Sequence, residues 1–234
     1  QHDNEKGSFY KNSVKPFKFG ERLENNFDID VCVVGGGLTG ISSALNLAKK
    51  GYSVALCEAR TLGWGASGRN GGQLGIAMRK DQFVIEKRFG FELAKELWNL
   101  GLEAVSETTK LISEHNIECA LQKGVISAGF SKKKRDDFHF EIDHMQKYYN
   151  FDGYKFLDKH TIKEEINTDI YDSGLLNNYN YHLNPLKLLL GLANELAKLK
   201  VKIYENTPIT KILNDQDGIK IYSETKVIKA KKVI

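Results

Sequence analysis

The stretch Asp30-Val31-Cys32-Val33-Val34-Gly35-Gly36-Gly37-Leu38-Thr39-Gly40 decides the fold. Its apolar first half is typical of a strand, and it runs directly into a G-x-G-x-x-G pattern. In a strand–turn–helix unit the first glycine permits the tight turn, the second lets backbone approach a pyrophosphate, and the third lets the helix pack closely. The helix N-terminus adds unpaired N–H groups and a positive dipole end. We therefore expect a dinucleotide to contact Gly35, Gly37, Leu38, Thr39 and Gly40.

A second apolar strand, residues 53–57, ends at Glu58, which lies 18 residues after Gly40. At this position the fold places a carboxylate on the hydroxyl pair of a ribose. A carboxylate there would repel a 2′-phosphate, which argues against NADP, but the motif does not separate NAD from FAD. Ala59 and Arg60 join Glu58 as candidate cofactor-binding residues, with a solvated surface arginine as the alternative interpretation of Arg60.

A second glycine-rich stretch, residues 63–75, has six glycines in thirteen positions. Because glycine weakens both helices and strands, this stretch predicts a loop whose backbone approaches a flat or charged ligand closely. Arg69 is one of six arginines against 28 lysines, and its planar fork suits phosphate or carboxylate. The alternative is a flexible linker, which Trp64 and the polar residues argue against. The candidate cofactor contacts are Gly65, Ala66, Ser67, Arg69, Asn70, Gly71, Gly72 and Gln73.

Together these motifs resemble the FAD-dependent oxidoreductases of the D-amino-acid oxidase/glycine oxidase family, and within it the gamma-glutamylputrescine oxidases. The resemblance rests on residues 30–40, on Glu58 and on residues 65–74, with weaker similarity at 123–128 and 182–186. It implies FAD as the cofactor. Asn184 departs from the pattern, because close relatives often have a histidine there, so the resemblance assigns this position no role.

The resemblance implies oxidation of an amine or amino acid. A neutral, gamma-glutamylputrescine-like amine would pass a hydride to flavin N5, the imine would hydrolyse, and dioxygen would reoxidise the flavin. It also implies that residues 70–73 lie beside the isoalloxazine and that the backbone around Ile209 meets the adenine, although periodicity alone makes Ile209 a core residue. Catalytic residues are otherwise unknown; His182 and Tyr181 are candidates for the substrate side, with a structural role as the alternative.

Three other functions remain open. The protein could be a flavin dehydrogenase that passes electrons to a quinone or carrier, or a non-catalytic FAD-binding subunit of a larger oxidase. A dehydrogenase using only NAD is disfavoured, because the loop at 65–73 has no role in a plain nicotinamide fold. No hydrolase constellation or metal-binding spacing is visible, and His139 and His144 are interpreted as solvated. The reactive group must therefore come from the cofactor.

Composition limits the partners. The 234 residues are 41% hydrophobic and 27% charged, which is typical of a globular chain, and the net charge of +4 is spread among interleaved acids. This argues against nucleic acid, and no run of residues is apolar enough to predict a membrane span. Three cysteines without paired spacing fit a reducing cytoplasm. We expect a small-molecule amine and dioxygen as partners and leave the oligomeric state open.

The predicted fold class is α/β: a Rossmann-like FAD-binding βαβ domain with an interleaved, mainly antiparallel α+β substrate domain. Residues 1–28 would form an N-terminal arm, 29–116 and 185–234 the FAD-binding domain, and 117–184 part of the substrate domain. The resemblance also implies truncation at the C-terminus, so that the chain is an N-terminal fragment that we expect to be inactive by itself.

Periodicity and turn residues predict the remaining elements. Helices are expected at 80–89, 91–115, 131–149, 159–166 and 186–199. Strands are expected at 117–121, 124–130 and 154–157, with irregular strands and turns at 171–184. A small meander is expected from strands at 201–204, 209–213, 219–222 and 226–228. Trp98 is expected in the core or at an interface rather than in the active site.

Overall fold

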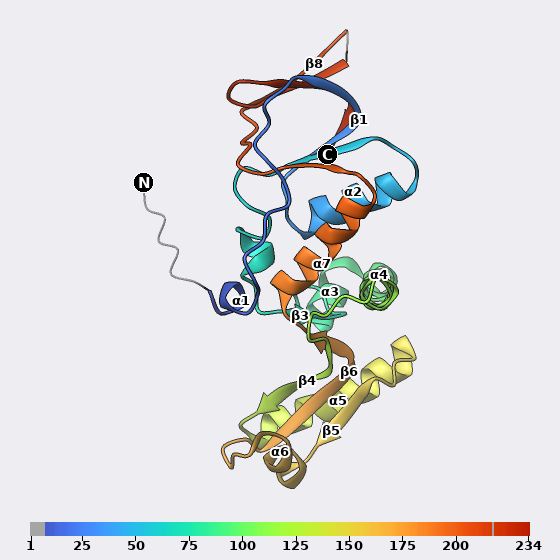
Figure 1. Ribbon diagram of the computed structural model, residues 1–234. Coiled ribbons are helices and arrows are strands. Elements are labelled where there is room, and N and C mark those ends of the chain that lie inside the picture. Colours follow the sequence, from blue (N-terminus) through green and yellow to red (C-terminus); the bar gives the residue numbers. More distant parts are fainter. Residues whose placement is uncertain (1–7, 217) are drawn as a thin grey trace. The chain divides into compact units, whose positions relative to one another are not determined.

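The computed structural model describes residues 8–216 and 218–234 (Figure 1). Contacts divide the chain into two compact units. Unit 1 comprises the residues up to 71 together with 112–119 and 184–234, and unit 2 comprises 72–111 and 120–183. The first seven residues of the predicted N-terminal arm lie outside the described residues.

Unit 1 is built on a six-stranded sheet in the order β7-β2-β1-β10-β9-β8. The strands are β1 (Phe27–Val34), β2 (Val54–Cys57), β7 (Lys202–Tyr204), β8 (Lys211–Asp215), β9 (Gly218–Tyr222) and β10 (Val227–Val233). The first four strands in this order run parallel, and β10, β9 and β8 form an antiparallel meander. Consecutive residues Val31, Cys32 and Val33 are all buried, which is typical of a parallel strand covered on both faces.

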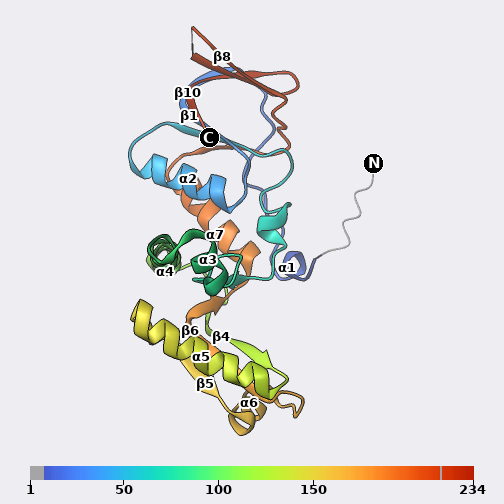
Figure 2. The ribbon, with the colours of Figure 1, turned by 180° about the vertical axis from the view of Figure 1, so that it is seen from behind.

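The helices of unit 1 are α1 (Phe9–Asn12), α2 (Leu38–Lys49) and α7 (Pro185–Lys198), with a 3₁₀ turn η1 (Ala66–Gly68). Ile41, Ala44 and Leu45 form the buried stripe of α2, at the spacing of one helix face. Helix α2 packs against β1, β2 and α7, and α2 and α7 lie side by side in both views (Figures 1 and 2). The βαβ unit predicted from the sequence is therefore present.

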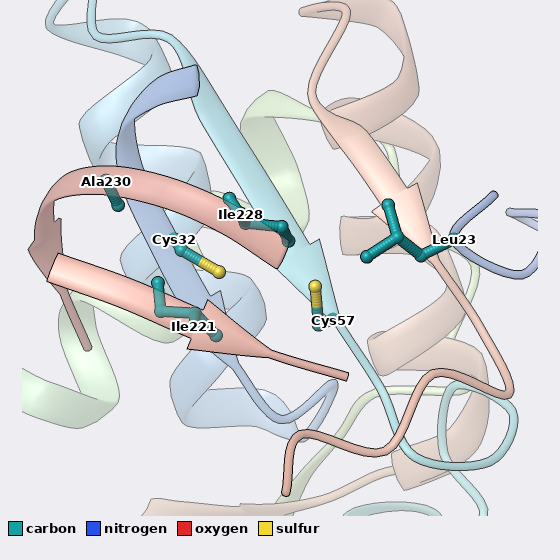
Figure 3. Packing of buried hydrophobic residues seen from close by; sticks show 6 residues of the cluster. All are labelled: Leu23, Cys32, Cys57, Ile221, Ile228 and Ala230. Atoms are coloured by element: carbon teal, nitrogen blue, oxygen red, sulfur yellow. The ribbon is translucent and has the colours of Figure 1, made fainter. Parts of the chain in front are cut away.

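A buried cluster joins the parallel strands to the meander (Figure 3). It consists of Leu23, Cys32, Cys57, Ile221, Ile228 and Ala230. Cys32 and Cys57 are buried and reduced, as predicted. A hydrogen bond with Cys32, together with burial, raises the pKa of the Cys57 thiol, so it stays protonated. These cysteines act as small apolar residues of the core.

Unit 2 is an antiparallel sheet with helices. Strand β6 (Ser173–His182) pairs with β3 (Gln73–Leu74), β4 (Gln122–Gly129) and β5 (Tyr154–Leu157). The helices are α3 (Gln82–Phe89), α4 (Phe91–Glu114, whose last turn belongs to unit 1), α5 (Lys132–Tyr149) and α6 (Lys159–Ile166). Helix α5 runs along β5 and β6 (Figures 1 and 2). Trp98 is 2% exposed in an apolar cluster with Ile76 and Phe151, so its predicted core position is confirmed.

One predicted strand is absent, and one segment is more regular than predicted. No strand forms at 117–121: Ala120 has a positive φ of 53°, which interrupts extended backbone, and β4 begins at Gln122. The segment 171–184 was predicted as irregular strands and turns, and residues 173–182 of it form one continuous strand. Pairing on both edges satisfies the backbone of this strand and overrides its local turn preference.

The predicted four-strand meander of unit 1 has only three strands. Strand β7 pairs in parallel with β2 instead, as expected of a strand that follows a helix packed on the same sheet. The short strand predicted at 226–228 is the start of β10, which continues to Val233 because β1 and β9 pair with it on either side.

Candidate dinucleotide-binding site

The first glycine-rich loop has the geometry that its sequence predicts. Gly35 adopts a φ of 109°, and its N–H donates to the carbonyl of Cys57 at 2.8 Å, which closes the turn onto β2. A methyl group on Gly40 would lie 2.0 Å from the carbonyl oxygen of Gly35, so only glycine allows α2 to begin this close to β1. The turn therefore presents backbone groups at the N-terminus of α2.

Glu58 lies at the carboxyl end of β2, next to this turn. One carboxylate oxygen accepts the Gly36 N–H at 2.7 Å, and the other accepts the Arg60 N–H at 2.8 Å. The backbone of Glu58 bonds to Tyr204 and Thr207 at 2.8 Å each. The structure thus brings Glu58 and the first loop together and holds the carboxylate in one orientation, with lone pairs left for a diol.

A serine hydroxyl joins the two loops. Ser67, in η1, accepts the Leu38 N–H at 3.1 Å, and Leu38 is the first residue of α2. The side-chain amide of Asn70 donates to the carbonyls of Ala66 and Ser67 at 3.3 and 3.1 Å. The second loop is therefore an ordered turn that touches the start of α2 rather than a flexible linker.

Two arginines stack on one tryptophan in the second loop. The guanidinium carbon of Arg60 lies 3.9 Å from the centre of the Trp64 ring, and that of Arg69 lies 4.9 Å from it. Neither guanidinium has an ion pair with an acid within residues 8–216 and 218–234. The sequence identified both arginines but gave Trp64 no role beyond arguing against a linker.

The remaining candidate side chains lie either beside the cysteine cluster of unit 1 or on the β3–β6 ladder of unit 2. Ile209 is half-buried against the cysteine cluster and precedes β8, so its side chain belongs to the core. In unit 2, Gln73 pairs with His182 and Leu74 with Tyr181 in the β3–β6 ladder, while the Leu183 N–H donates to Gly72 at 2.8 Å. The structure therefore brings Gln73 and the two substrate-side candidates together. His182 is exposed and Tyr181 half-buried.

Asn184 has a structural role. It caps α7 by accepting the Lys187 N–H at 3.0 Å, and its amide donates to the Ser13 hydroxyl at 2.8 Å. An asparagine at a helix N-cap needs no functional explanation.

The interpretation of His144 as solvated is wrong. It packs against Phe83 and bonds to Glu86 at 2.9 Å, because α3 covers this face of α5.

One residue near the loops was not found from the sequence. Glu205 is 1% exposed; one oxygen accepts the N–H groups of Phe19 and Gly20, and the other accepts the Leu62 N–H at 2.7 Å. These hydrogen bonds connect the N-terminal arm and the residue before the second loop to the residue that follows β7. No periodicity or spacing marks such a residue, because its partners are 143 and more residues away.

One hollow of the described surface lies apart from both glycine-rich loops. A hollow of about 750 Å³ lies over α7, and none of its lining residues belongs to either glycine-rich loop. Among the described residues, no three His, Cys, Asp or Glu side chains are grouped so that they could hold a metal ion. No helix in the described ranges has the length and apolarity needed to cross a bilayer.

The turn, the helix N-terminus and the strand-end carboxylate define a dinucleotide-binding protein of the Rossmann-like class. The family described as FAD dependent oxidoreductase (DAO) matches residues 30–234, and the chain belongs to this family. The family assignment confirms the resemblance stated from the sequence, and FAD is the cofactor of the family.

Two bacterial proteins are similar over most of the chain. The chain is 34% identical over 205 residues to the gamma-glutamylputrescine oxidoreductase of Escherichia coli, and 32% identical over 207 residues to the probable oxidoreductase OrdL of Haemophilus influenzae. Each alignment covers 88% of this chain and 48% of the relative. The chain therefore spans about half the length of these relatives.

Solved structures show the same fold. Glycine oxidase from Geobacillus kaustophilus matches with a TM-score of 0.74 at 23% identity, covering 88% of this chain and 54% of that one. L-amino acid deaminase from Proteus myxofaciens matches with a TM-score of 0.73 at 18% identity, covering 94% and 47%. The predicted fold class is confirmed.

Proposed function

We propose that the protein containing this chain oxidises a small amine or amino acid with FAD. The observation that carries the proposal is the Glu58 carboxylate, which is fixed beside the glycine turn. It is supported by Arg60 and Arg69, which lie on the Trp64 ring and have no acidic partner among the described residues. Bound FAD would supply the two-electron acceptor for cleavage of the C–H bond next to the amine nitrogen.

The residues of unit 1 fit the adenine half and the diphosphate of FAD. Backbone N–H groups at the start of α2 would hold phosphate oxygens, Glu58 would accept the ribose hydroxyls, and Arg60 and Arg69 would balance the negative charge. Gly65 and Ala66 lie in the same loop, and Ala59 lies between Glu58 and Arg60. Backbone groups around Ile209 are proposed to border the adenine.

The flavin ring and the substrate are assigned by proposal to the rest of the second loop and to β6. Asn70, Gly71, Gly72 and Gln73 would border the isoalloxazine, and His182 and Tyr181 would contact the substrate. An exposed imidazole can accept a proton from an ammonium group, which would deliver the amine in its neutral, reactive form.

The substrate class follows from the relatives' names. One relative is a gamma-glutamylputrescine oxidoreductase, so we propose a gamma-glutamylputrescine-like amine and dioxygen as the electron acceptor. Unit 1 would be the FAD-binding part and unit 2 part of the substrate domain. The buried, reduced cysteines support a cytoplasmic location.

Anaerobic reduction of the flavin tests the proposal. The protein, expressed from the longest reading frame that contains this chain, should be yellow, and gamma-glutamylputrescine should bleach its flavin absorbance without air. Admitting air should restore the absorbance and release hydrogen peroxide. Bleaching reversed only by a quinone would establish a dehydrogenase, and no bleaching by any amine would establish a non-catalytic FAD-binding protein.

A matched histidine pair tests the substrate side. We expect His182→Ala to lower kcat/KM about 10²-fold, the scale of one proton-transfer group. His160→Ala is the control, because the His160 side chain is 82% exposed and lies on α6. Equal activity of the two variants would show that His182 has no role in the reaction.

A further inference from the structure

The arrangement of Arg60, Trp64 and Arg69 goes beyond the cofactor contacts named above. Both guanidiniums lie on the ring of Trp64, which is 39% exposed. An indole face attracts one cation, but two cations on one ring repel each other. With no acidic partner in the described ranges, the pair leaves a local positive charge that an anion would neutralise.

The backbone of both arginines is fixed independently of their side chains. Arg60 donates its N–H to Glu58, and its carbonyl accepts the Asn206 N–H at 2.7 Å. Arg69 follows η1, and its N–H donates to Ala66 at 3.1 Å. Only the long, flexible side chains remain to be ordered, and a rotamer-rich side chain costs free energy to immobilise.

Each arginine lies two residues from a side chain that is hydrogen-bonded to the first loop or to the start of α2. Arg60 lies two residues after Glu58, whose carboxylate holds Gly36. Arg69 lies two residues after Ser67, whose hydroxyl holds the Leu38 N–H. Both contacts end at the turn that precedes α2, where a helix N-terminus already favours anions.

We propose that Trp64 is a positioning residue that holds Arg60 and Arg69 together beside the first loop, so that the pair binds the diphosphate of FAD. This inference rests on the proposed function, since it requires FAD at the first loop. Trp64 acts through the arginines and need not touch the cofactor itself.

The test is titration of the apoprotein, expressed from the same longest reading frame, with FAD at low and high salt. Trp64→Leu should raise the Kd for FAD about tenfold at low salt and less at high salt, because the lost contribution is electrostatic. Trp64→Phe, which retains an aromatic face, should stay within about threefold of the wild type. If the leucine variant does not fold, Trp64→Met gives the same comparison.

A double-mutant cycle separates positioning from other roles. In the Arg60→Ala/Arg69→Ala background, Trp64→Leu should cause no further loss of FAD affinity. The same loss in both backgrounds would overturn the inference, because Trp64 would then act without the arginines. An unchanged Kd for Trp64→Leu would also overturn it while leaving the proposed function intact. Failure of the wild type to bind FAD would instead overturn the proposed function.

Discussion

The two glycine-rich loops of unit 1 differ in what holds them. The first, residues 35–40, closes through the Gly35 backbone N–H, and α2 starts in contact with the Gly35 carbonyl. The side chains of Glu58 and Ser67 also accept its Gly36 and Leu38 N–H groups. The second, within residues 63–75, combines backbone hydrogen bonds with side-chain contacts, namely those of the Ser67 hydroxyl, the Asn70 amide and the Trp64 ring.

Two kinds of substitution are expected to disrupt these contacts. A close backbone approach fails when a side chain is added, at Gly40 in the first loop and at Gly68 in the second, whereas a side-chain hydrogen bond fails when the side chain is removed. The first kind of failure is steric and large, because a methyl group cannot fit where a carbonyl already lies. The second is a loss of individual bonds, each of which contributes about 1 kcal/mol.

The largest expected effect comes from adding one methyl group to the first loop. Gly40→Ala should lower the free energy of unfolding by about 1–3 kcal/mol and raise the Kd for FAD more than tenfold, because the added atom would lie 2.0 Å from the Gly35 carbonyl. Chemical denaturation and FAD titration measure the two changes.

Gly65→Ala is the matched control in the second loop. An added methyl group there meets no atom within 4 Å, and Gly65 has an ordinary φ of −79°. Both quantities should stay close to the wild type. Equal losses from the two variants would show that the loops are not held differently.

The second-largest expected effect on FAD affinity comes from removing the Glu58 carboxylate. Glu58→Ala should weaken FAD binding by about 1.5–3 kcal/mol, because it removes charge-assisted hydrogen bonds to the ribose and frees the Gly36 and Arg60 N–H groups. At saturating FAD, kcat should change little. Glu21→Ala, which removes an exposed acid paired with Lys18, is the control. Unchanged affinity would make Glu58 a surface acid with a structural role only.

The sequence predicted the first loop better than the second for the same reason. The main constraints on Gly35 and Gly40 are local, since one needs a positive φ and the other lies against the Gly35 carbonyl, and a strand–turn–helix pattern predicts both. Glu58 could be found because its distance from Gly40 follows from the length of one βαβ crossover. The predicted bounds of the strand at 154–157 and of the helix at 159–166 match the structure, because local periodicity and caps determine them.

What the sequence did not predict depends on partners far along the chain. Glu205 was missed because the N–H groups that it accepts come from the N-terminal arm and the second loop. Strand β6 was predicted only as irregular strands and turns, because its pairing with β4 and β5 cannot be seen in its own residues. The proposed role of Trp64 could not be predicted, because only the structure shows that the arginines four and five residues away both lie on its ring.

The smallest expected effect removes the bond that joins the two loops. Ser67→Ala deletes the hydroxyl that accepts the Leu38 N–H, and the loss should be about 1 kcal/mol in FAD binding, or roughly fivefold in Kd. Water can replace the hydroxyl at this half-buried position, so the free energy of unfolding should change by less than it does in Gly40→Ala. The exposed Ser106→Ala is the control, and FAD titration with thermal unfolding of each apoprotein gives both numbers. A loss as large as that of Gly40→Ala would mean that the Ser67 hydroxyl matters as much to the first loop as its own backbone contact at Gly40, and the contrast between the loops would then fail.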